Sequence, residues 1–177
     1  MSAIAEGIAS YAQEKRLSAQ TVQRWQSWPE QDRAAFFLVA KELQLNDNQL
    51  RDFLDWLEEI VARDGGTVQD ILARTELQRP LESKLSRSDK LKAVKETLRK
   101  IRYPRLAQLE EDLRVAIKAL DLGNRVRVSF PPALEGNEIT LEIKARNVQE
   151  IRDNLMQLQQ KLEAGSLQRV FELLDEV

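Results

Sequence analysis

The side chains of this chain that could take part in chemistry are mainly its cations, because the groups most used in catalysis are missing. Neither histidine nor cysteine occurs among the 177 residues. The commonest general base, the commonest metal ligand and thiolate chemistry are therefore excluded. No phosphate-binding loop, metal-ligand spacing or nucleophile elbow gathers the remaining carboxylates, lysines and tyrosines. We expect a protein that is not an enzyme and that uses no cofactor.

One segment concentrates positive charge in a chain whose formal net charge is only −2. Between residues 84 and 105, nine basic residues stand against two acidic ones. Such a segment is where a polyanion such as DNA would bind. The alternative is a solvated charged face of a helix. The residues of this segment that we predict to contact DNA are Lys84, Arg87, Lys92, Lys95, Arg99, Lys100, Arg102 and Arg105.

A second candidate for DNA contact is a helix-turn-helix pattern in residues 40–54. A small residue, Ala40, stands where the two helices would cross, and Gln44 occupies the turn position at which glycine is usual. At the start of the second helix, the amides of Asn48 and Gln49 can pair with adenine, and Arg51 can reach guanine or phosphate. Carboxylates on the same helix would repel phosphates, so a hairpin of helices that serves packing alone is the other interpretation.

Residues 104–162 carry the pattern helix, strand, strand, helix. Apolar residues recur every three or four positions before Gly123, alternate through the two strands, and return to helical spacing after Asn147. An isolated two-stranded hairpin is barely stable in water and leaves its edges open, and a second copy of the chain would remedy both. We therefore predict a homodimer. Its predicted interface residues are Val126, Val128, Ile139, Leu141, Ile143, Ile151, Leu155 and Leu158.

These patterns predict a mostly α fold with a small β-hairpin, of the α+β class. We expect a helical domain at residues 1–74 and a linker at residues 75–87, where Pro80 and several serines interrupt the periodicity. Residues 88–177 would hold the basic helix and the dimerisation module. The absence of a long apolar run or a signal peptide leads us to expect a cytoplasmic protein, without membrane contact and nucleoid-associated if it binds DNA.

The order of these elements resembles the C-terminal part of ParB-type chromosome and plasmid partition proteins. The likeness covers residues 35–160, and its closest parts are residues 124–130, residues 136–143 and the helix from Val148. It implies a homodimer closed through paired strands and helices, with a basic surface that holds DNA without sequence preference. It also implies a helix-turn-helix that binds a palindromic site. The nucleotide-binding domain of that family has no counterpart in this sequence, so CTP binding is not implied.

We therefore expect a homodimeric, ParB-like DNA-binding protein engaged in DNA partition or transcription regulation. The alternative is a dimeric adaptor or regulator that binds no nucleic acid and docks another protein through its N-terminal helical domain. Trp25 and Trp28 separate the two hypotheses. Exposed tryptophans would anchor a protein partner, whereas tryptophans in the core of a helical domain, which their spacing favours over base stacking, would not.

Overall fold

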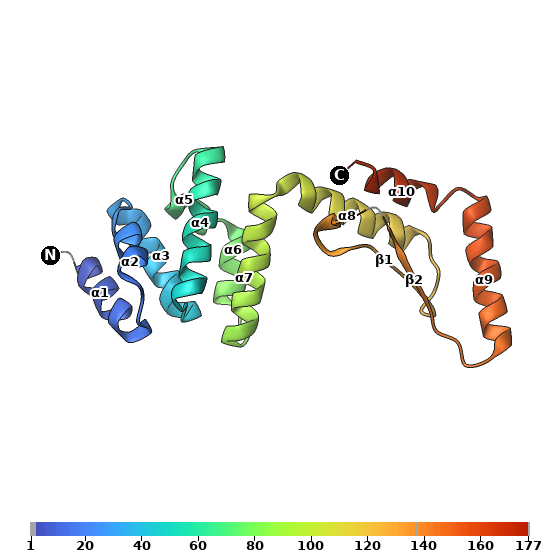
Figure 1. The fold of residues 1–177 in the computed structure, drawn as a ribbon, viewed down its shortest axis with the longest axis horizontal. Helices are drawn as coiled ribbons and strands as arrows, with labels where there is room; N and C mark the ends of the chain where they lie inside the picture. The colour runs from blue at the N-terminus through green and yellow to red at the C-terminus, as the bar shows by residue number, and fades with distance from the viewer. Residues whose placement is uncertain (1–2, 137, 177) are drawn as a thin grey trace. The chain divides into compact units, whose positions relative to one another are not determined.

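Helices make up most of the chain, and one small β-hairpin interrupts them (Figure 1). The structure is a computed structural model that describes residues 3–136 and 138–176. It divides the chain into two units, Met1–Arg102 (unit 1) and Tyr103–Val177 (unit 2). The predicted class, mostly α with a small hairpin, is confirmed.

Unit 1 consists of helices whose ends follow the capping residues in the sequence. The side chains of Ser18, Asn46 and Thr67 each accept a hydrogen bond from a backbone N–H in the first turn of the helix that follows. The helices of unit 1 are α1 (Ala3–Lys15), α2 (Ala19–Gln26), α3 (Glu30–Leu43), α4 (Asp47–Asp64), α5 (Val68–Leu72), α6 (Thr75–Glu82) and α7 (Arg87–Arg102).

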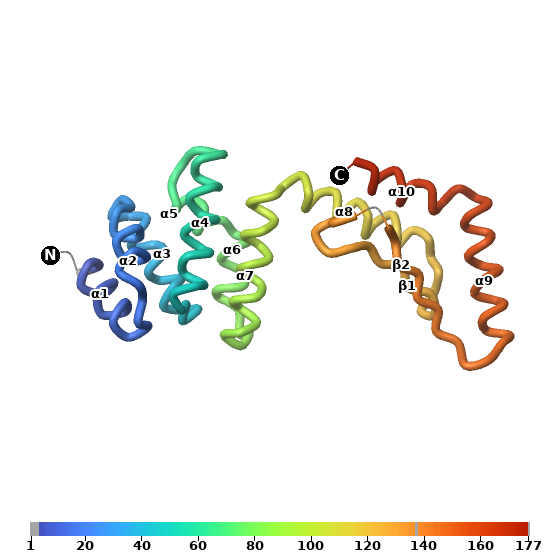
Figure 2. The backbone as a smooth tube through the Cα atoms, in the orientation of Figure 1, coloured from blue at the N-terminus to red at the C-terminus, as the bar shows by residue number. Residues whose placement is uncertain are grey.

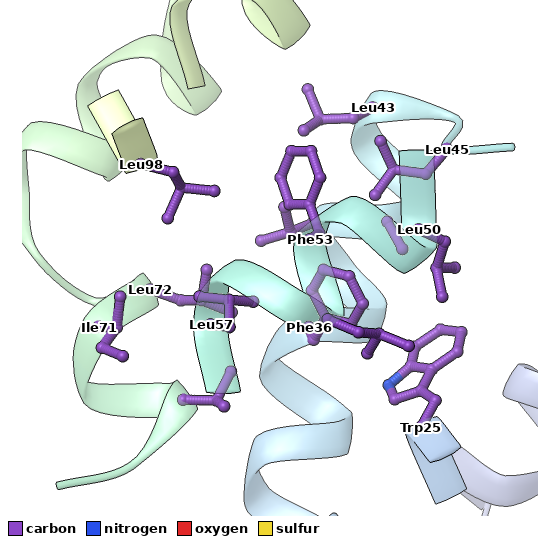
Figure 3. Close-up of a cluster of buried hydrophobic side chains, with 14 of the residues drawn as sticks. Trp25, Phe36, Leu43, Leu45, Leu50, Phe53, Leu57, Ile71, Leu72 and Leu98 are labelled. Atoms are coloured by element: carbon purple, nitrogen blue, oxygen red, sulfur yellow. The ribbon is translucent and has the colours of Figure 1, made fainter. Parts of the chain in front are cut away.

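Aromatic and aliphatic side chains together fill the core of unit 1 (Figure 3). The ring of Trp25 lies edge-on to that of Phe36, with centroids 5.3 Å apart, and Phe36 stacks on Phe53 at 6.2 Å. Trp25 and Trp28 are both buried. Their interpretation as core residues is confirmed, and neither ring is available to stack on a base or to anchor a partner.

The turn between α3 and α4 is held from α1. Gln44 takes the left-handed conformation, with φ 52°, that the sequence pattern usually assigns to glycine. The Tyr11 hydroxyl contacts the carbonyl oxygens of Ala40 and Leu45 at 2.8 and 2.9 Å, and Lys15 Nζ donates to Gln44 Oε1 at 2.5 Å. These contacts fix the helix-turn-helix as a rigid part of unit 1.

The boundary between the units differs from the predicted linker at residues 75–87. Most of that segment forms α6, which packs on α7 and buries Leu77 completely. The burial of one leucine side chain is enough to attach a short polar helix to a core. The polar composition of the segment gave no indication of this packing. The basic helix α7 consequently belongs with unit 1, because Val94, Leu98 and Ile101 are buried in that core. Unit 2 starts one residue before Pro104, the first residue of α8.

Unit 2 places the hairpin between helices (Figure 2). Its strands pair antiparallel, with Val126 opposite Ile143 and Arg127 opposite Glu142. The Asn147 side chain caps α9 by accepting the Glu150 N–H at 2.9 Å. The elements of unit 2 are α8 (Pro104–Ala119), β1 (Val126–Ser129), a 3-10 turn η1 (Pro132–Leu134), β2 (Thr140–Ile143), α9 (Val148–Glu163) and α10 (Gln168–Leu174).

Candidate DNA-contact and self-association surfaces

The predicted base-reading residues lie at the exposed start of α4 but are bonded to their own helix. The Asn46 N–H donates to Gln49 Oε1 at 3.1 Å while the Gln49 N–H donates to Asn46 Oδ1 at 3.0 Å, which closes a capping box. Asn48 accepts a hydrogen bond from the Arg51 guanidinium, which also lies 3.5 Å from an Asp47 carboxylate oxygen. The side-chain oxygens of Asn48 and Gln49, and the Arg51 guanidinium, therefore stabilise the first turn of α4.

Asp47 adds a fixed negative charge to the same turn. Burial alone would raise the pKa of its carboxyl group. Hydrogen bonds from the Ser18 N–H, at 2.9 Å, and from the Ser18 and Thr21 hydroxyls more than offset this effect and hold the pKa below its usual value. The carboxylate thus stays ionised beside the residues that would meet phosphates, which weakens this turn as a DNA reader.

The cations on one side of α7 face carboxylates of α3 and α4. Lys90 Nζ lies 2.5 Å from Glu42 Oε1, and Lys95 Nζ lies 3.2 Å from Asp52 Oδ2. Arg102 donates to Glu59 with two nitrogens, Nη2 at 2.8 Å from Oε1. Lys95 and Arg102, both predicted to contact DNA, are therefore half-buried between helices.

The other predicted cations of the basic segment differ in exposure. Arg99 is half-buried and forms a forked hydrogen bond to Glu96 of its own helix, at 2.9 and 3.0 Å. Arg105 is exposed on the first turn of α8 and so belongs to unit 2. Within unit 1, four cations of the segment are exposed and form no ion pair with any carboxylate of residues 3–136 or 138–176. They are Lys84, Arg87, Lys92 and Lys100.

A further cationic group, which the sequence did not single out for DNA contact, lies at the open end of the hairpin. The antiparallel register brings the start of β1 next to the end of β2, where the Lys144 N–H donates to the Arg125 carbonyl at 2.8 Å. We call Arg125, Arg127, Lys144 and Arg146 the hairpin cations. Glu142 lies opposite Arg127 and 3.6 Å from Lys144. Strand alternation in the sequence places these side chains on one face of the hairpin. The register then brings together residues that lie about twenty positions apart in the sequence.

The predicted interface residues separate into two sets. Val126, Val128 and Leu158 are buried within unit 2, and Ile139 and Ile143 pack against the same core, so these five contribute to the core of a single copy. Strand alternation looks the same whether a strand covers its own helix or a partner, which is why the sequence could not separate the sets. The remaining predicted residues are exposed, namely Leu141 at 45%, Ile151 at 44% and Leu155 at 51%.

The exposed apolar side chains of α9 form a stripe along one side of the helix. Val148, Ile151, Leu155 and Leu162 (the α9 stripe) follow the three-and-four spacing of coiled coils, with exposed fractions of up to 73%. Leu158 is the buried residue that attaches α9 to the core of unit 2. A helix of this kind is typical of a surface that another helix covers.

No family model, curated protein or solved structure matches the chain. Within the described residues, acidic side chains nowhere cluster in the manner of a metal site. The same residues contain no helix with the length and apolar character needed to cross a membrane. The surfaces that bear on function are the hairpin cations, the α9 stripe and the exposed cations of unit 1.

Proposed function

We propose that the chain is a non-catalytic, homodimeric DNA-associated protein, which assembles through unit 2 and contacts DNA through exposed cations. The observation that carries this proposal is that two of the hairpin cations, Lys144 and Arg146, lie directly before the helix that bears the exposed α9 stripe, and that the register places Arg125 beside Lys144. One small module thus presents both a surface for a polyanion and a surface for a second copy. The likeness to ParB-type partition proteins, with a role in DNA partition or transcription regulation, is part of this proposal.

The need of α9 for a partner supports the homodimer. The helix has 16 residues, a length at which an isolated helix is marginal in water, and its own unit covers little of its apolar side. Two copies of the α9 stripe would bury each other. Full burial of one such aliphatic side chain contributes about 1.5–3 kcal/mol, so several side chains from each copy suffice for a stable dimer.

The hairpin cations support the contact with DNA. Arg125, Arg127 and Lys144 alternate with core residues along the strands, so their side chains lie on the outward face of the sheet. Glu142 is the acidic residue on that face. Each phosphate contact releases counterions, and a homodimer makes every contact twice. The geometry favours backbone contact that is independent of DNA sequence, because the polar groups expected to read bases on α4 are bonded within that helix.

Fluorescence anisotropy of a labelled duplex, titrated across a range of salt concentrations, tests the proposal. Each phosphate contact contributes about −0.9 to the slope of log affinity against log salt. The double variant Arg125→Glu, Lys144→Glu should therefore flatten the slope by about 1.8 per copy. Arg114→Glu with Arg169→Glu makes the same change of charge at exposed positions of α8 and α10 and is the matched control.

Two outcomes would contradict the proposal. One is the absence of binding to any duplex by the wild-type protein at low salt. The other is an equal loss of affinity in the test and control variants, since this would assign binding to net charge rather than to the hairpin cations. Sedimentation or light scattering on the same samples reports the mass, and a monomer at micromolar concentration would contradict the homodimer.

A protein adaptor is the second candidate, and a groove in unit 1 favours it. The groove has a volume of about 710 Å³ between α3, α5 and α6, and its lining includes Val39, Leu72 and Leu81. Leu38, which is 69% exposed, also lines it. Leu38→Glu should abolish capture of a helical protein partner and leave the anisotropy titration with DNA unchanged. If the wild-type protein binds DNA but no protein through this groove, the adaptor hypothesis fails.

A further inference from the structure

Among the described residues, β2 is the strand that pairs with β1, and the other edge of β1 pairs with no strand. The Lys144 N–H bonds to the Arg125 carbonyl, and in an antiparallel pair hydrogen-bonded positions alternate with non-bonded ones. Val126 opposite Ile143 and Val128 opposite Leu141 are therefore non-bonded pairs, whose N–H and C=O groups point away from the neighbouring strand. No backbone or side-chain hydrogen bond from residues 3–136 or 138–176 reaches these groups of Val126 and Val128.

A groove runs along this edge. It has a volume of about 540 Å³, and Val126, Arg127 and Val128 of β1 line it together with the end of α8 and the turn that follows. Ile117 and Leu122 supply apolar lining, and Lys118 lines the same groove. The groove thus combines unbonded strand groups with apolar side chains and cations, the three features that an added strand uses.

The charges of the groove indicate what the added strand carries. Lys118 and Arg127 are exposed, and within the described parts of the chain neither forms an ion pair. Asp121 is the carboxylate that lines the groove beside them. An incoming strand would place every second side chain on the outward face, next to Arg127, and the others towards Ile117 and Leu122.

We propose that the β1 edge binds an extended segment of a partner protein, apolar at alternate positions and acidic at the positions between. Val126 and Val128 supply the backbone hydrogen bonds, and Lys118 and Arg127 select for carboxylates. This binding goes beyond the proposed DNA contact and does not depend on it, because DNA has no backbone that could extend a sheet. A strand from a second copy is the competing occupant, and the experiment separates the two.

The test uses the full chain labelled with ¹⁵N and a synthetic eight-residue peptide in which valine and glutamate alternate. Amide hydrogen exchange should slow at Val126 and Val128 when the peptide binds, while the opposite edge at Leu141 and Ile143 keeps its exchange rate. Two control peptides replace glutamate by lysine or scramble the order of the same residues. Both should bind about tenfold more weakly or worse, as expected for the loss of about 1.4 kcal/mol in charge or register.

A substitution in the groove provides the second arm. Lys118→Glu should weaken binding of the acidic peptide about tenfold, whereas Arg152→Glu, an exposed cation of α9 outside the groove, should leave it unchanged. The proposal is overturned if the acidic peptide perturbs neither Val126 nor Val128, or if the lysine peptide binds equally well. Slow exchange at both amides before any peptide is added would also overturn it, because a second copy would then already occupy the edge.

Discussion

Lys95 Nζ on α7 lies 3.2 Å from Asp52 Oδ2 on α4 and 5.4 Å from the centre of the Trp56 ring. A cation that the sequence assigns to DNA therefore faces α4, which carries more acidic residues than any other helix described in unit 1. Arg24 repeats this relationship from the other side, with Nη1 2.6 Å from Asp55 and Nη2 2.5 Å from Glu58. Cations of α2 and α7 thus neutralise part of the negative charge of α4. The charge that is unevenly distributed along the sequence is therefore partly balanced in the folded unit.

This neutralisation predicts different roles for two lysines three residues apart on α7. Because Lys92 is exposed, Lys92→Glu should reduce the slope of log DNA affinity against log salt by about 0.9 for each phosphate contact that is lost. Lys95→Glu should instead lower the free energy of unfolding by about 1 kcal/mol, since it sets a carboxylate against Asp52. Anisotropy and urea denaturation on both variants check the prediction. A larger effect of Lys95→Glu on DNA affinity in folded protein would contradict it.

Tyr11 predicts how unit 1 responds to alkaline pH. Burial, followed by the nearby Glu14 carboxylate, raises the pKa of the phenol from its usual 10.0 to about 12. Between these values the unfolded chain releases the proton and the folded chain keeps it, so this contribution to stability is complete below pH 10 and is lost as pH rises towards 12. Tyr11→Phe should cost about 1–2 kcal/mol at neutral pH and give a shallower alkaline decline. Urea denaturation at several pH values measures both effects, and parallel declines would contradict the assignment.

The α9 stripe predicts which substitutions separate the homodimer. Leu155→Glu places a charge within the stripe and should shift the mass to that of a monomer, because a buried unpaired carboxylate is costly. Met156 is also exposed, at 55%, but lies about 100° further around the helix. Met156→Glu, the matched control, should leave the dimer intact. Sedimentation equilibrium distinguishes the two variants, and dissociation of both would show that the interface is not confined to the stripe.

A substitution of Leu77 tests whether residues 75–87 act as a linker or as part of unit 1. Since its side chain is completely buried, Leu77→Ala should destabilise unit 1 by about 2–5 kcal/mol. Amide exchange should accelerate throughout α3 and α4 while the hairpin of unit 2 keeps its protection. A leucine in a solvated linker would instead tolerate the change within about 0.5 kcal/mol, and that result would restore the boundary expected from the sequence.

Local rules predicted the elements well. The helix that starts after Asn147 and the two strands of the hairpin follow from side chains and backbone within a few residues of each other. The left-handed residue at Gln44 also stands where the turn pattern required it. Such features can be predicted from the sequence because the interacting groups are neighbours along the chain.

Features that depend on distant residues were not predicted. Lys95 and Asp52 are 43 positions apart, and no periodicity indicates that α7 lies against α4. The assignment of Val126 and Val128 to the core of unit 2 rather than to a partner has the same origin, since both environments require the same alternation. Strand alternation places the hairpin cations on the outward face, but only the register shows that Arg125 and Lys144 are neighbours.

That register has a consequence for natural variation of the chain. Because Arg125 and Lys144 are neighbours through the ladder, the residues between β1 and β2 can be lengthened, shortened or exchanged without separating the two cations. Insertions at the far end of the hairpin would thus be neutral for the positive face, whereas a slip of one residue between the strands would turn the cations of the slipped strand towards the core. Homologous sequences should therefore vary freely in the length of this loop and hardly at all in the number of residues within each strand.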